Sequence, residues 1–297
     1  MPASGEAAAA GCPVCGCGSR TWAVKRGFAI LECLRCSHRF CAAGAASGHV
    51  AQHYGDDYFE GGGAGYVDYR AQHDLLVARG RRYGELLRRH APAGRLLDVG
   101  AAAGFILKGL QDAGWSGAGL EPNASMVRHG REALGLDLRE GTLEDLPQQE
   151  QFDVVSMVQV IAHFPDPARA LAAAARALKP GGLWLVETWD KDSLAARLQG
   201  AGWHEYSPPT VLQWFSRPAL AQLCGRFGMA VVATGRPVRW LTARHAASLA
   251  CHSWGRGSLP PWVLRAIPAR LQLPYPPLDL FWMLLRKVGG ERPGPLP

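Results

Sequence analysis

Residues 95–104, with the sequence RLLDVGAAAG, set the class of fold. The first half, Arg95–Val99, is a short apolar run of the kind that forms a buried strand. The second half is a loop of small residues between Gly100 and Gly104, and a helical pattern follows from Phe105. Small residues between a strand and a helix let the backbone approach a ligand closely. The stretch therefore predicts a strand, a ligand-binding loop and a helix of an α/β domain.

Beyond this loop, short apolar runs alternate with helical patterns, which indicates a parallel sheet covered by helices on both faces. The next apolar run, residues 117–120, ends at Glu121. A carboxylate at this place can bind both ribose hydroxyls of an adenosine. The glycine spacing of the loop is G-x-x-x-G, whereas dinucleotide sites have G-x-G-x-x-G. The loop therefore departs from the pattern of an NAD site.

Five segments in chain order resemble the motifs of class I S-adenosylmethionine-dependent methyltransferases. They are residues 98–104, Glu121, residues 141–147 (GTLEDLP), residues 152–167 and residues 178–188. The resemblance is closest to the branch with an N-terminal zinc ribbon, which is often found among small-molecule and sugar-modifying methyltransferases. Ala102 stands where the first motif usually has glycine, and Ala162 stands where a glutamate often precedes His163. Because Ala162 replaces the glutamate, the chain lacks the acid that could act with His163 in an acid- or metal-assisted role.

The resemblance implies a Rossmann-like, seven-stranded, mostly parallel sheet with helices on both faces. We expect five parts along the chain: a zinc-ribbon module at 1–45, an aromatic linker and lid helix at 46–92, the methyltransferase core at 93–235, a helical, substrate-covering insertion at 236–277 and a final core strand at 278–290. The apolar pattern of the last part also suits a short helix, and the resemblance favours an antiparallel strand.

The motifs imply how S-adenosylmethionine is bound. Asp98 would position the loop or the methionine amino group, and Glu121 would hold the ribose. Tyrosines in the linker form either a lid over the cofactor or a surface on which the ribbon docks. The expected cofactor-binding residues are Tyr58, Tyr69, Asp98, Gly100, Ala101, Gly104, Phe105, Glu121, Pro122, Thr142, Leu143, Glu144, Val158 and Gln159.

Methyl transfer from a sulfonium requires the nucleophile, the methyl group and the sulfur to be collinear. A hydroxyl or acidic-carbon nucleophile also needs a base. His163 follows the fourth strand at the carboxyl edge of the sheet, where α/β proteins bind ligands. It acts either as this base or as a brace for its loop. His204 and Tyr206 lie in an aromatic loop that faces the substrate in the resembling branch, and they are further catalytic candidates, with core packing as the alternative.

Six of the eight cysteines precede residue 42, and four of them form two C-x2-C pairs with 17 residues between the pairs. These four are Cys12, Cys15, Cys33 and Cys36. Two such pairs complete a tetrahedral shell of four thiolates, which suits a structural zinc ion with no open position for catalysis. The intervening segment indicates a short hairpin, as in a zinc ribbon. Cys17 and Cys41 are left over, His38 could replace one thiolate, and free buried cysteines are the alternative.

The chain has 297 residues and a net charge of +7. Of the 32 basic residues, 27 are arginines, and they are scattered, which favours solvated helix faces over a surface that follows phosphates. We find no secretory signal pattern. No apolar run reaches the roughly 18 residues of a membrane span. We therefore expect a cytoplasmic protein without a membrane partner.

The leading hypothesis is a methyltransferase that acts on a small molecule, such as a sugar or a secondary metabolite. An RNA methyltransferase that grips nucleic acid with its ribbon is the second hypothesis. The ribbon lacks the dense basic and aromatic stripe that such binding needs. A non-catalytic scaffold that binds a protein partner is the third, and an intact Glu121 and loop argue against it. The oligomeric state and the methylated atom are not indicated.

Overall fold

The computed structural model describes residues 11–41, 53–59, 69, 72–147, 149–242, 272–275 and 279–288. The chain forms two compact units: Met1–Gly235 together with Asp279–Pro297, and Arg236–Leu278. In the second unit, the strands β11 (Arg239–Thr242) and β12 (Gln272–Tyr275) pair antiparallel. Most of the insertion expected at 236–277 lies outside the described residues, and its substrate-covering role stays a prediction.

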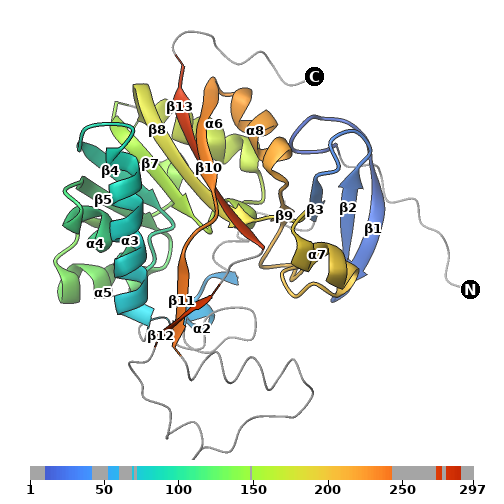
Figure 1. Ribbon diagram of the computed structural model, residues 1–297, viewed down its shortest axis with the longest axis horizontal. Coiled ribbons are helices and arrows are strands. Elements are labelled where there is room, and N and C mark those ends of the chain that lie inside the picture. The colour runs from blue at the N-terminus through green and yellow to red at the C-terminus, as the bar shows by residue number, and fades with distance from the viewer. Residues whose placement is uncertain are drawn as a thin grey trace, which may run out of the picture. The chain divides into compact units, whose positions relative to one another are not determined.

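A seven-stranded sheet forms the centre of the first unit, in the order β10-β13-β8-β7-β4-β5-β6 (Figure 1). Its strands are β4 (Arg95–Val99), β5 (Ser116–Glu121), β6 (Leu138–Glu140), β7 (Phe152–Val158), β8 (Leu178–Trp189), β10 (Met229–Gly235) and β13 (Leu280–Lys287). Only β13 runs against the others, because it pairs antiparallel with both β8 and β10. The Rossmann-like fold expected from the sequence is therefore confirmed, and Leu280–Lys287 is a strand.

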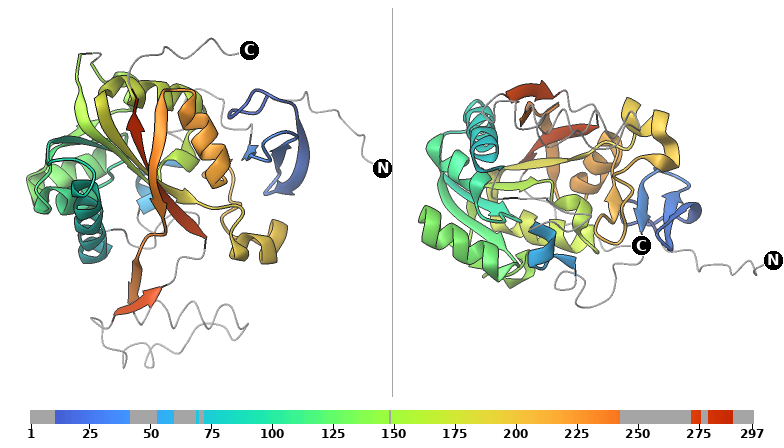
Figure 2. Two further views of the ribbon diagram at one scale, coloured as in Figure 1. Left: turned by 45° about the horizontal axis from the view of Figure 1, so that its top comes forward. Right: turned by 90° about the horizontal axis from the view of Figure 1, so that it is seen from below.

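Helices cover both faces of this sheet (Figures 1 and 2). One face carries α3 (His73–Arg88), α4 (Phe105–Asp112) and α5 (Ala124–Leu134), and the other carries α6 (Pro167–Ala177) and α8 (Arg217–Gly225). Alternate strand residues divide between the two cores: Leu96 packs with the first group and Leu97 with the second. The short elements are α2 (Asp56–Phe59), α7 (Leu194–Gln199) and the 3-10 turns η3 (Leu143–Asp145), η4 (Ile161–His163) and η5 (Gly200–Gly202).

The N-terminal cysteine module contains a hairpin, as expected, of β1 (Ser19–Lys25) and β2 (Phe28–Cys33). The strand β3 (Arg39–Cys41) follows, and it pairs with β9 (Gln213–Trp214) from the C-terminal third of the chain. The result is a separate four-stranded sheet, β1-β2-β3-β9. The module also shares a buried core with α8 and the adjoining face of the large sheet. The five-part division of the chain remains a prediction.

Among the described residues, no helix has the length and apolar character that crossing a membrane requires.

Helices α3 and α4 cross at glycines, and this close contact places α3 beside the cofactor loop. Gly80 of α3 and Gly109 of α4 face each other's backbone. A Cβ added at Gly109 would overlap the carbonyl oxygen of Val77, and one at Gly80 would overlap that of Ile106. Backbone atoms cannot yield as a flexible side chain can, so the crossing requires glycine.

We predict that Gly109→Ala lowers the free energy of unfolding by about 1–3 kcal/mol, the usual cost of overpacking a core. The loss occurs although alanine favours helix by about 1 kcal/mol over glycine. Urea unfolding measures the change. Gly225→Ala is the matched control, because Gly225 is also helical and nothing lies within 4 Å of its added Cβ. Equal stability of both variants and the wild type would contradict the prediction.

Candidate functional site

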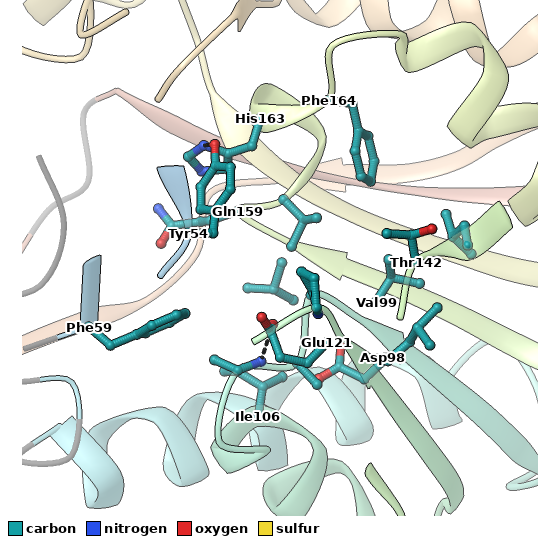
Figure 3. Close-up of a pocket in the computed structure, with 18 of the residues that line it drawn as sticks. Tyr54, Phe59, Asp98, Val99, Ile106, Glu121, Thr142, Gln159, His163 and Phe164 are labelled. Carbon is teal, nitrogen blue, oxygen red and sulfur yellow. Dashed lines mark hydrogen bonds between the residues drawn. The ribbon is translucent and has the colours of Figure 1, made fainter. Parts of the chain in front are cut away.

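A pocket opens at the carboxyl ends of β4, β5 and β7 (Figure 3). It encloses about 1070 Å³ of empty space, its open mouth included. The lining is largely apolar, with a few polar groups: Tyr54, Tyr69, Arg79, Asp98, Glu121, Thr142, Gln159 and His163.

The Glu121 carboxylate is fixed by two backbone groups at the end of β5. The N–H of Ala102 donates to Oε2 and the N–H of Asn123 donates to Oε1, each at 2.9 Å. Burial raises the pKa of Glu121, and these two donors lower it. Ala102 has φ 48°, the left-handed conformation that favours the glycine usual at this position. The chain therefore accepts local backbone strain to aim this N–H at the carboxylate.

Asp98, at the penultimate position of β4, is buried with only 2% of its surface exposed. Its Oδ1 accepts a hydrogen bond of 2.6 Å from the Ser156 hydroxyl on the neighbouring β7. Burial raises the pKa of Asp98 to about 7, the Ser156 hydrogen bond opposes this, and the negative charge of Glu121 adds to it. Two carboxylates at the ends of adjacent strands therefore share one poorly solvated site.

Arg79 brings a buried positive charge from α3 to the pocket wall. Its guanidinium forms an ion pair with Glu187 of β8, and the Tyr83 hydroxyl donates to the same carboxylate. Arg79 was not predicted from the sequence. The available signal was its spacing, because it lies three residues after Leu76 and four before Tyr83 on the apolar side of the helix.

His163 of η4 lies in the part of the pocket beside Tyr54 and Gln159 (Figure 3). Its Nδ1 is 2.9 Å from the Thr210 carbonyl oxygen and 3.0 Å from the Tyr54 hydroxyl. The Tyr54 hydroxyl also donates to the Thr210 carbonyl at 2.6 Å. A carbonyl oxygen only accepts, so Nδ1 carries the proton. Burial lowers the pKa of His163, against the opposing effect of the Thr210 and Gln159 backbone.

The pocket brings together most of the residues expected from the motifs. Those that line it are Tyr69, Asp98, Gly100, Ala101, Glu121, Pro122, Thr142, Leu143, Val158, Gln159 and His163. The side chain of Tyr58 lies outside the described residues. Gly104 and Phe105 start α4 behind the loop, where Phe105 stacks on Tyr69 with 5.2 Å between ring centroids. Their contribution is to support the wall.

Three further expected site residues, Glu144, His204 and Tyr206, are not among those that line the pocket. Glu144 faces Arg169, 3.7 Å away. His204 is largely exposed and pairs with Glu205 at 3.0 Å. Tyr206 is buried in a cluster of aromatic rings, where its hydroxyl accepts from Arg39 at 2.6 Å. The structure therefore does not join His204 and Tyr206 to His163, and core packing accounts for Tyr206.

Other lining residues were not expected from the motifs. Those with side chains that shape the pocket are Tyr54, Phe59, Leu76, Arg79, Val99, Ile106, Leu120, Val160 and Phe164. Tyr54 and Phe59 come from the linker, whose cluster of aromatic residues was the one available signal. Figure 3 shows Phe59 and Thr142 on opposite sides of Glu121.

A second group of polar side chains, the four-cysteine cluster, contains Cys12, Cys15, Cys33 and Cys36. Sulfur–sulfur distances are 3.4 Å for Cys15–Cys33 and 3.6 Å for both Cys12–Cys36 and Cys15–Cys36. Disulfides are far shorter, at about 2.05 Å. Tetrahedral zinc–sulfur bonds of about 2.3 Å place the sulfurs about 3.8 Å apart. The spacing therefore suits a shared metal ion better than disulfides.

Backbone groups already support thiolate character in this cluster. The N–H groups of Arg35 and Cys36 point at the Cys33 sulfur, at 3.4 and 3.5 Å. Burial raises the pKa of the Cys33 thiol, but the hydrogen bonds outweigh burial and lower that pKa to about 7. Two other candidate metal ligands contact other groups. The His38 ring forms a hydrogen bond with Gln213, and the Cys17 sulfur faces the Cys15 carbonyl.

The strand order, the glycine loop after β4 and the carboxylate after β5 define a class I S-adenosylmethionine-dependent methyltransferase. Residues 66–234 match the family model described as a methyltransferase domain, which is more than half of the chain. The chain belongs to this family.

Among curated relatives, the ubiquinone biosynthesis O-methyltransferase of Bradyrhizobium sp. (strain ORS 278) is 33% identical over 130 residues, which are 41% of this chain and 49% of that protein. The protein of the same name from Hahella chejuensis is 31% identical over 159 residues, 46% of this chain and 67% of the relative. The chain thus spans about half to two thirds of the length of these relatives.

A chain of the complex between the Haloferax volcanii Trm112 methyltransferase activator and a methyltransferase has the same fold. The TM-score is 0.55 at 17% identity, with 75% of this chain and 93% of that chain covered.

The raised pKa of Asp98 predicts a pH-dependent stability. A carboxyl whose pKa rises from 3.8 to about 7 on folding stabilises the fold when protonated. That contribution is complete below about pH 4 and is lost as the pH rises through about 7. We predict that Asp98→Asn, which keeps the Ser156 acceptor, gains on the order of 4 kcal/mol over the wild type at pH 8 and nothing at pH 4. Thermal unfolding between these pH values measures the difference, and parallel curves would contradict it.

Proposed function

We propose that this protein transfers the methyl group of S-adenosylmethionine to a hydroxyl oxygen of a small molecule. One observation carries the proposal: a single pocket contains Asp98, Glu121 and His163. The relatives are named as O-methyltransferases of ubiquinone biosynthesis, which supports an oxygen acceptor. A sugar or a secondary metabolite with an acidic hydroxyl is the class of substrate we propose.

The residues of the pocket fit this cofactor. Glu121 offers two carboxylate oxygens for the ribose hydroxyls, and the apolar walls around Val99 and Leu143 suit adenine. The Asp98 carboxylate and the Arg79 guanidinium suit the amino and carboxylate groups of the methionine part. When bound, S-adenosylmethionine supplies an electrophilic methyl group on a positively charged sulfur.

His163 suits the role of base for the substrate hydroxyl. Because burial lowers its pKa, the imidazole is neutral at neutral pH and can accept a proton. The Thr210 carbonyl holds the Nδ1–H and leaves Nε2 as the basic atom. Once protonated, the ring is stabilised by the backbone of Thr210 and Gln159. Tyr54 and Phe164 also line the pocket.

The first test uses methyl-labelled S-adenosylmethionine with an extract of the source cell. We expect label in the small-molecule fraction. His163→Gln should lower that labelling by about 10²- to 10⁴-fold, the usual contribution of a general base. Glu121→Gln should weaken cofactor binding by about 10- to 100-fold, because it removes the charge from two hydrogen bonds. Calorimetric titration with the cofactor measures the second effect.

Glu144→Gln is the matched control, since Glu144 is a nearby carboxylate that does not line the pocket. It should bind the cofactor as the wild type does. Label in the RNA fraction would show that the substrate is RNA and not a small molecule. Cofactor binding without label in any fraction would argue for a non-catalytic scaffold. Unchanged labelling by His163→Gln would show that His163 is not the base.

We also propose that the four-cysteine cluster holds one structural zinc ion. The observation that supports it is the spacing of the four sulfurs within 4.8 Å of one another. A closed shell of four thiolates leaves no coordination position for a substrate, so the metal would stabilise the module and take no part in methyl transfer.

We predict one zinc ion per chain by metal analysis of the purified protein. Cys36→Ser should lose the metal and much of the stability of the module, because a three-thiolate site binds more weakly. Cys17→Ser is the matched control: it removes a neighbouring thiol outside the cluster and should keep the full zinc content. Loss of zinc in both variants, or no zinc in the wild type, would contradict the proposed site.

A further inference from the structure

A short bridging segment, Thr210–Trp214, joins the cysteine module to the turn that carries His163. On the module side, the Cys41 N–H donates to the Leu212 carbonyl at 2.8 Å. The β3 residues Arg39 and Phe40 pair with Trp214 and Gln213. The bridging segment therefore completes the sheet of the module although it lies more than 170 residues away in the chain.

On its other side, the same segment contacts η4 and its flanks. The Leu212 N–H donates to the Ala162 carbonyl at 2.9 Å. Two residues earlier, the Thr210 carbonyl accepts from His163 Nδ1 and from the Tyr54 hydroxyl. The position of the segment thus sets where the acceptor for His163 lies.

Gln213 connects the two sides with its carboxamide, and it is only 2% exposed. Its Nε2 donates to the Phe164 carbonyl at 3.2 Å, and its Oε1 is 2.9 Å from His38 Nε2. Because the Phe164 carbonyl can only accept, the amide nitrogen must face it, and the amide oxygen then accepts from His38. His38 is fully buried and follows the ligand Cys36 by two residues. Both ends of the amide are satisfied in a dry site, where such bonds orient strongly.

We propose that Gln213 is a positioning residue that lets the folded, metal-loaded cysteine module hold His163 in its Nδ1–H tautomer. This role rests on the proposed function of His163 as the base. The cofactor-binding groups Asp98 and Glu121 are on β4 and β5, which do not pair with the bridging segment. The segment connects to Glu121 less directly: Tyr54, whose hydroxyl donates to the Thr210 carbonyl, accepts through its own carbonyl from the Asn123 side chain. We therefore expect release of the segment to disturb the base while the two backbone hydrogen bonds of Glu121 remain.

The test records long-range proton–nitrogen correlations of the histidine rings by NMR in the zinc-loaded, full-length protein. The His163 signal is assigned by its absence in His163→Gln. The wild type should show the Nδ1–H pattern. Gln213→Met keeps the volume and removes both hydrogen bonds, so it should shift His163 to the Nε2–H form or to a mixture. Its dissociation constant for S-adenosylmethionine should stay within about twofold of the wild type.

Ser193→Ala is the matched control. It removes a buried hydrogen bond of 3.1 Å at the start of α7, which packs in the same core as Ala162 and Leu212, and it leaves the hydrogen bonds of the bridging segment intact, so the His163 pattern should stay unchanged. Removal of the metal from the wild type by a chelator gives a second measurement that does not depend on the folding of Gln213→Met. It should produce the same shift of His163 with cofactor binding retained.

An Nε2–H pattern in the wild type, or an unchanged Nδ1–H pattern after either Gln213→Met or removal of the metal, would overturn the positioning role. Loss of cofactor binding in parallel with the tautomer change would also overturn it, because it would show general unfolding. These outcomes are separate from the proposed function, which fails when His163→Gln transfers methyl groups as fast as the wild type does.

Discussion

Two backbone N–H groups hold the Glu121 carboxylate, and the arrangement of the pocket depends on this clamp. One comes from Ala102 in the loop after β4, and the other from Asn123 at the start of α5. The carboxylate therefore ties together the ends of two neighbouring strands. The arrangement has two costs: Ala102 adopts a left-handed backbone, and burial, together with the charge of Glu121, raises the pKa of Asp98. A site that tolerates both costs is organised for a ligand rather than for stability alone.

The cysteine module affects the pocket through hydrogen bonds to a segment that is far from it in the chain. Its third strand ends at Cys41, and the strand that completes its sheet lies at Gln213–Trp214. A small module of this kind has little apolar core of its own, so packing against a neighbouring surface contributes to its stability. Here the surface belongs to the segment that carries the acceptor for His163. The same contacts that stabilise the module therefore also fix the turn beside the pocket.

The sequence predicted the parts of the fold that depend on local pattern. The strand Arg95–Val99, the glycine loop and the hairpin of the cysteine module follow from alternation and spacing over a few residues. It did not predict Arg79, whose partner Glu187 is 108 residues away, or the contact of His38 with Gln213. Such pairs form only when separate elements meet. In the aromatic loop, the sequence suggested a site residue where the structure shows a buried ring. Tyr206 has the chemistry of an active-site residue, but its ring is packed in the core.

The charges of the pocket give a physical reason for a cationic methyl donor. Asp98 and Glu121 are two carboxylates in one buried site, and the Arg79 guanidinium that lines the same pocket is paired with Glu187. A ligand that brings positive charge restores the balance and lowers the pKa of Asp98 toward its ordinary value.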